Sequence, residues 1–132
     1  MKLKNSILIL LTTTFIFACS KGPGPGGTST VTGKINVEDY NQTFTTLWAT
    51  YDGTDRDVYL RYGDNPTYSE HVKSGPEGDF EFNYLTKGNY SVYVYSKDSS
   101  LQAPSGQISI IQEFEITENK QIVVVPTIIV FE

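Results

Sequence analysis

The chain has 132 residues, of which 39% are hydrophobic and 13% aromatic, and it carries a formal net charge of −5. This length suits one domain with a single core. The acidic balance argues against a nucleic-acid partner, and because the charges are spread along the chain they do not indicate a disordered acidic tail.

The first 18 residues have the layout of a secretory signal peptide. Lys2 and Lys4 form a basic segment, residues 7–17 an apolar segment, and Ala18 a small residue at the expected cleavage point. The uncharged segment 5–18 is shorter than the roughly 20 residues that a membrane-spanning helix needs. We therefore expect residues 1–18 to be removed.

Cys19 is the only cysteine of the chain and directly follows this signal. Residues 16–19, Ile-Phe-Ala-Cys, resemble the lipobox of bacterial lipoproteins, which implies a lipid on the Cys19 thiol and a membrane partner. An ordinary secretory signal is the alternative, but it leaves an unpaired thiol in an exported protein. The residue after Cys19 is Ser20 and not an aspartate, and in this the chain is similar to lipoproteins that are sorted to the outer membrane.

Residues 19–30 are rich in glycine and proline and predict a flexible tether. The folded domain is then expected over residues 31–132. Removing residues 1–18, which carry two lysines and no acids, leaves 114 residues with a net charge of −7.

A hydrophobic period of two dominates the domain and predicts strands with one buried and one wet face. Phe80, Phe82 and Tyr84, for example, share one parity and are expected to face the core. The last strand is apolar on both parities, as a strand covered on both faces would be, with Pro126 at a bulge or edge. The predicted strands are 31–38, 44–51, 57–62, 67–73, 79–85, 89–97, 107–117 and 121–131. Glycine-rich and Asn/Asp-rich turns separate them, which favours an all-β fold, a single antiparallel β-sandwich of about seven or eight strands with Greek-key topology.

Residues 78–92 read G-D-F-E-F-N-Y-L-T-K-G-N-Y-S-V and resemble the G-x-F-x-F-x-x-L-x-x-G-x-Y-x-V signature of transthyretin-like sandwiches. This group includes carboxypeptidase-regulatory-like and collagen-adhesin B-type domains. Residues 31–35 resemble their opening V-x-G-x-V strand. The resemblance implies that Leu85 closes the core and that Gly88 permits a turn. Some adhesin domains carry a Lys-Asn crosslink, but Lys34 has no asparagine on the predicted last strand, so we expect none.

Catalytic and cofactor chemistry are not indicated. His71 is the only histidine, and the Cys19 thiol would be blocked by lipid. Few residues are therefore available to form a pair of catalytic nucleophile and base. The acidic residues Glu77, Asp79 and Glu81 are typical of a solvated strand face. We predict a protein that is not an enzyme and binds no cofactor.

Asp52, Asp55 and Asp57 offer hard oxygen ligands in one loop, and calcium accepts such ligands. Their spacing does not match an EF-hand. We treat them as weak candidates and predict no metal site.

The best ligand-binding candidates are Tyr59, Tyr93 and Tyr95, which fall on the outward parity of their strands. If their strands are neighbours, the three rings form a platform on which a sugar or a protein partner can stack. The alternative is cross-strand tyrosine pairing that only covers the sheet. Trp48 is ambiguous, because neighbouring apolar residues compete with it for the inner face.

The sequence thus predicts a lipid-anchored binding or structural module at the outer membrane, facing the periplasm or the medium. Two alternatives remain open. One is a carbohydrate-binding accessory of a glycan-uptake system, and the other is a subunit of a pilus or surface complex.

Overall fold

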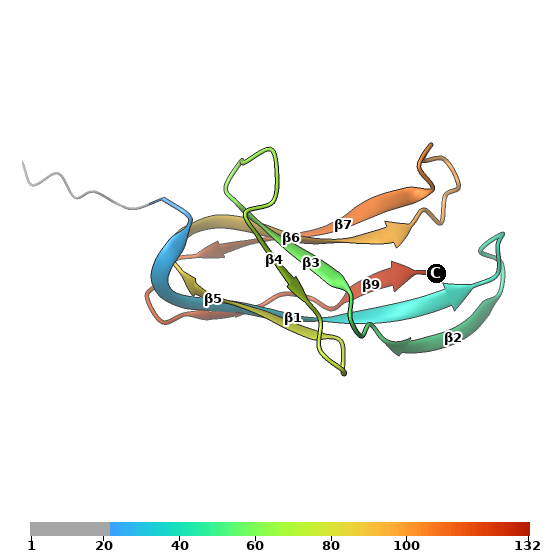
Figure 1. The fold of residues 1–132 in the computed structure, drawn as a ribbon, viewed down its shortest axis with the longest axis horizontal. Coiled ribbons are helices and arrows are strands. Elements are labelled where there is room, and N and C mark those ends of the chain that lie inside the picture. The colour runs from blue at the N-terminus through green and yellow to red at the C-terminus, as the bar shows by residue number, and fades with distance from the viewer. Residues whose placement is uncertain (1–21) are drawn as a thin grey trace, which may run out of the picture.

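The computed structural model describes residues 22–132, which form nine strands and, within that range, no helix (Figure 1). The predicted signal peptide and Cys19 lie outside the described residues. The strands are β1 (Pro25–Tyr40), β2 (Leu47–Asp52), β3 (Asp57–Tyr62), β4 (Glu70–Lys73), β5 (Asp79–Leu85), β6 (Gly88–Lys97), β7 (Gln107–Ile116), β8 (Ile122–Val124) and β9 (Ile128–Phe131). They build two sheets that face each other, which confirms the all-β sandwich.

The long strand β1 is the centre of the first sheet. Its first half pairs with β5 and β8, and its second half pairs with β2 and β9. The second sheet has the order β4-β3-β6-β7 and is antiparallel throughout. The first sheet is not, because β8 and β9 run parallel to β1. Strand β7 ends beside the start of β6, at the end of the molecule where β1 begins, so the chain returns in the direction of β1.

The core lies between the two sheets and follows the predicted alternation. Its buried apolar side chains come from β1 (Val31, Ile35, Val37), β3 (Val58, Leu60), β5 (Phe80, Phe82, Leu85), β6 (Tyr90, Val92, Val94), β7 (Ile116) and the C-terminal strands with their connection (Val125, Ile128, Val130). Removing this apolar surface from water is the main stabilising term of the sandwich.

The strand predicted over residues 121–131 is divided in two, and the expectation that it is covered on both faces was wrong. Residues 125–127, which include Pro126, separate β8 from β9. Ile122 and Val124 point away from the core and are 70% and 72% exposed. Only one parity is buried, because nothing in the described chain packs on the outer face of these strands.

The expected alternation also fails at the end of β5. Tyr84 is 73% exposed, and Leu85, the next residue, is buried in its place. Tyr84 has a φ of 60°, in the left-handed region, and this local turn shifts the side-chain parity by one residue. Leu85 therefore closes the core as predicted, whereas Tyr84 does not face it.

The segment predicted as a tether, residues 19–30, is partly folded. Strand β1 begins at Pro25, so residues 25–30 belong to the sheet. The Tyr90 hydroxyl accepts a hydrogen bond from the Gly24 amide at 2.9 Å and donates one to the Thr86 carbonyl at 2.7 Å. A Cβ atom at Gly27 would overlap the Leu85 backbone, so this close approach requires glycine. The glycines of this segment predicted a flexible tether. In the structure, their lack of side chains instead allows the backbone to pack closely against the sheet.

Candidate functional site

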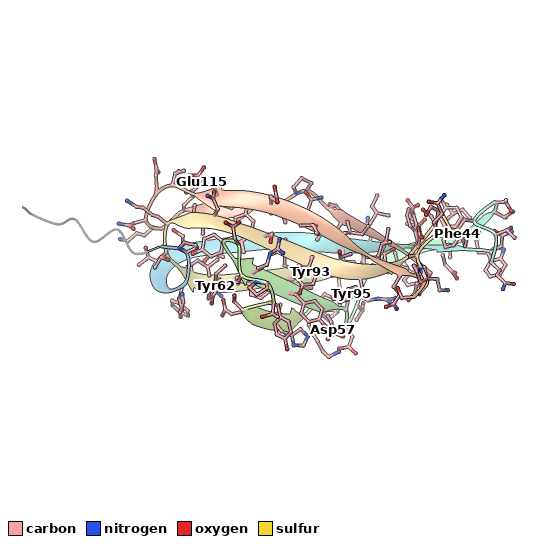
Figure 2. All side chains as sticks on the ribbon, turned by 90° about the horizontal axis from the view of Figure 1, so that it is seen from above. Phe44, Asp57, Tyr62, Tyr93, Tyr95 and Glu115 are labelled. Atoms are coloured by element: carbon pink, nitrogen blue, oxygen red, sulfur yellow. The ribbon has the colours of Figure 1, made fainter. Side chains whose placement is uncertain are left out.

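The three predicted tyrosines lie together on the outer face of the second sheet. Strand β3 is paired with both β4 and β6, which places Tyr59 directly opposite Tyr93 on one side and opposite His71 on the other. Tyr95 follows on the same face of β6. Figure 2 shows Tyr93 and Tyr95 along this sheet, with Asp57 nearby.

Two further side chains complete the cluster, which we call the tyrosine face: Tyr59, Tyr68, His71, Tyr93 and Tyr95. The centroid of the Tyr59 ring lies 5.2 Å from that of Tyr93 and 4.9 Å from that of His71, in both cases stacked. Tyr68 and Tyr95 pack against Tyr59 at tilted and edge-on angles, with centroids at 5.0 and 5.7 Å. Cross-strand aromatic pairs of this kind stabilise a sheet.

The stacking changes the expected geometry of the platform. Tyr59 has one ring face against Tyr93 and the other against His71, so its faces are not free for a ligand. Loss of hydration raises the pKa of both Tyr59 and Tyr93, as expected for phenols packed against their neighbours. Tyr68 and Tyr95, in contrast, are 52% and 53% exposed. Tyr68 was not singled out from the sequence, although the predicted strand 67–73 includes it. In the structure β4 begins only at Glu70, and Tyr68 lies in the segment before it.

A polar rim borders the tyrosine face beside β4. His71 Nε2 lies 2.7 Å from Asp57 Oδ1, and Lys73 Nζ lies 3.3 Å from the same oxygen. The hydrogen bond from His71, followed by that from Lys73, lowers the pKa of Asp57. The single histidine thus belongs to an open, solvated ion cluster, next to the aromatic rings.

The acidic residues considered for calcium each have a cationic neighbour. Asp52 pairs with Lys34 at 2.9 Å, and Asp55 and Asp57 both face Lys73. Within residues 22–132 no group of three metal-ligating side chains comes together. The arrangement is that of exposed ion pairs, and Lys34, the lysine considered for a crosslink, is engaged in one of them.

A second concave region lies at the end of the molecule that carries the β1–β2 hairpin. Trp48, which the sequence left ambiguous, is 67% exposed on β2. It lines an open cleft of about 550 Å³ between this hairpin and the β6–β7 connection. Figure 2 shows Phe44, another lining residue, at this end. The sequence showed no signal for the cleft, because its two walls are about 50 residues or more apart in the chain.

Within residues 22–132, no helix is long and apolar enough to cross a bilayer.

No protein-family model matches this sequence, and no curated protein matches it. Among solved structures, the fold is similar to a protein of Pseudomonas aeruginosa described as a "putative carbohydrate binding protein", with a TM-score of 0.49 and 16% identity over 78% of this chain and 90% of that one. It is also similar to an (S)-allantoin synthase, with a TM-score of 0.44 and 13% identity; this match covers 78% of this chain but only 42% of the synthase chain. These likenesses concern the β-rich fold alone.

Proposed function

We propose that this protein is a non-catalytic binding module of a bacterial envelope, anchored by lipid on Cys19, and that it binds carbohydrate on the tyrosine face. The observation that carries the proposal is the half exposure of Tyr68 and Tyr95, which both pack against the partly buried ring of Tyr59. Monomeric proteins rarely expose several large aromatic rings in one patch without a use for them.

The inner rings of the cluster serve as a support. Tyr59 and Tyr93 are held by stacking, and neither needs to move when a ligand arrives. Such a preformed base lowers the entropy that binding costs. A sugar ring stacks on the exposed tyrosines by its C–H face and requires no deep pocket, while Asp57, His71 and Lys73 offer hydrogen bonds to its hydroxyls at the rim.

The docked N-terminal segment bears on how the anchor holds the domain. Gly24 is fixed by Tyr90, so few residues remain between Cys19 and the fold. Four residues, 20–23, lie between Cys19 and Gly24 and span at most about 14 Å when extended. Lipid on Cys19 therefore holds this end of the sandwich close to the outer membrane surface, much closer than a tether of 12 residues would.

Carbohydrate binding is tested by replacing the two exposed rings. We expect Tyr68→Ala with Tyr95→Ala to weaken binding to the glycans found on an array by about tenfold or more, since truncating exposed aromatic anchors removes most of their contact energy. The midpoint of urea unfolding should change little. Tyr84→Ala is the control, because it removes an even more exposed tyrosine ring from the other sheet. Equal binding by both variants would contradict the proposal.

Anchoring is tested separately with Cys19→Ser. We expect the wild-type chain to incorporate a palmitate analogue and to fractionate with membranes, and the variant to do neither. A wild-type chain that stays unlabelled and soluble would remove lipidation from the proposal without affecting the tyrosine face.

A further inference from the structure

The cleft beside Trp48 has the make-up of a second binding site. It lies where the two sheets separate at the end of the sandwich, and we call it the end cleft. Its apolar surface comes from Trp48 and Phe44 on the hairpin and from Leu101 on the opposite wall, with Trp48 67% and Leu101 63% exposed. Large apolar side chains on both walls of an open cleft are costly to leave in water unless a ligand covers them.

Both walls are held in place by internal hydrogen bonds. On the hairpin, Asn41 Oδ1 accepts from the backbone amides of Thr45 and Thr46 at 2.8 and 3.1 Å. On the opposite wall, the buried Asp98 carboxylate accepts from the amides of Gln102 and Ala103 at 2.9 and 2.6 Å. The end cleft is therefore preformed, which favours binding because little has to be ordered when the ligand arrives.

Three polar side chains of the lining remain available to a ligand. Asp39, Gln42 and Lys97 form no side-chain hydrogen bond or ion pair within the described part of the chain, although the charge of Lys97 acts on the nearby Glu132 carboxylate. They provide a carboxylate, an amide and an ammonium group, a combination that can both donate to and accept from hydroxyl groups. Exposed aromatic faces together with such groups match the alternating C–H and O–H surface of a pyranose.

The charge of the lining further restricts the class of ligand that the end cleft can bind. Asp39, Asp98 and Glu132 contribute carboxylates and Lys97 contributes an ammonium group. Glu132 is also paired with Arg56, which is not part of the lining, so one carboxylate remains in excess. An anionic ligand would be repelled at this end of the molecule. We infer that the end cleft is a binding site for an uncharged oligosaccharide, distinct from the tyrosine face.

The position of the end cleft suits this role. In Figure 1 the chain enters the fold at the left end, where β1 begins, and the β1–β2 hairpin and the β6–β7 connection lie at the right end. A lipid attached before residue 22 would leave the cleft open on the side away from the membrane. The inference deepens the proposed carbohydrate function, but it rests on the lining of the cleft and not on the tyrosines.

The test uses the fact that Trp48 is the only tryptophan of the chain. Its fluorescence therefore reports on the end cleft and not on the tyrosine face. The full chain in phosphatidylcholine vesicles is titrated with cellotetraose, maltotetraose and, as the charged counterpart, tetragalacturonate. We expect at least one neutral tetrasaccharide to change the Trp48 emission in a saturable way and to bind about tenfold or more tightly than tetragalacturonate.

Calorimetry on variants completes the test. Trp48→Ala should abolish binding of the neutral tetrasaccharide at the end cleft, and Tyr84→Ala, the exposed-ring control, should retain it. The Tyr68→Ala and Tyr95→Ala variant should keep the Trp48 response, so that failure at one site is distinguished from failure at the other. The inference is overturned if neither neutral sugar changes the emission, if tetragalacturonate binds equally well, or if only a peptide such as tetra-alanine produces a response.

Discussion

Phe82 and Tyr84 provide a direct test of where the core ends along β5. They are aromatic, they stand two residues apart on one strand, and simple alternation assigns them the same environment. In the structure, Phe82 is 3% exposed and its ring lies edge-on to that of Phe80, with centroids 6.3 Å apart, whereas Tyr84 is 73% exposed.

The magnitude of each substitution follows from this difference. Phe82→Ala removes a buried ring and leaves a cavity between the sheets, which typically costs about 3–5 kcal/mol. Tyr84→Ala removes a solvated ring and leaves the backbone at the same φ, so we expect a change below about 0.5 kcal/mol. The predicted loss at Phe82 is a large part of the stability of a typical domain, which is about 5–15 kcal/mol.

Urea unfolding, followed by circular dichroism, measures the difference. With a slope of about 1.5 kcal/mol per molar urea, Phe82→Ala should lower the midpoint by about 2–3 M, and Tyr84→Ala should leave it nearly unchanged. Equal shifts for the two variants would refute the turn at Tyr84 and restore the simple alternation. Glu81→Ala, on the exposed face of β5 directly before Phe82, is expected to behave as Tyr84→Ala does.

Three further predictions concern other parts of the fold. Tyr90→Phe should destabilise the protein by about 1–3 kcal/mol, because it leaves the Gly24 amide without its hydrogen bond, and protease cleavage near Gly24 should become faster in the variant. Gly33→Ala should cost about 1–3 kcal/mol in a urea melt, since the added methyl group meets the ring of Phe80. Hydrogen bonds from the Ser100 side chain and from the loop amides lower the pKa of Asp98 to about 2. The stability that these bonds give the folded protein is complete above the unfolded pKa near 4 and is lost as the pH falls toward about 2. Asp98→Asn should therefore flatten this part of an acid-unfolding curve.

The sequence by itself determined where most of the strands lie. The predicted ranges 57–62 and 79–85 coincide with β3 and β5, because period-two alternation is a local property of a pleated strand with one buried face. The outward parity of Tyr59, Tyr93 and Tyr95 followed from the same property.

The tertiary structure decided what these strands do together. Strand β7 stops at the end of the sandwich where β1 begins, and β8 and β9 therefore run parallel to β1. Tyr68 joins the tyrosine face because the segment before β4 brings its ring against Tyr59 on β3. The end cleft exists only where the hairpin meets the β6–β7 connection. Pairing, direction and cleft formation depend on contacts between residues distant in sequence, and no local pattern encodes such contacts.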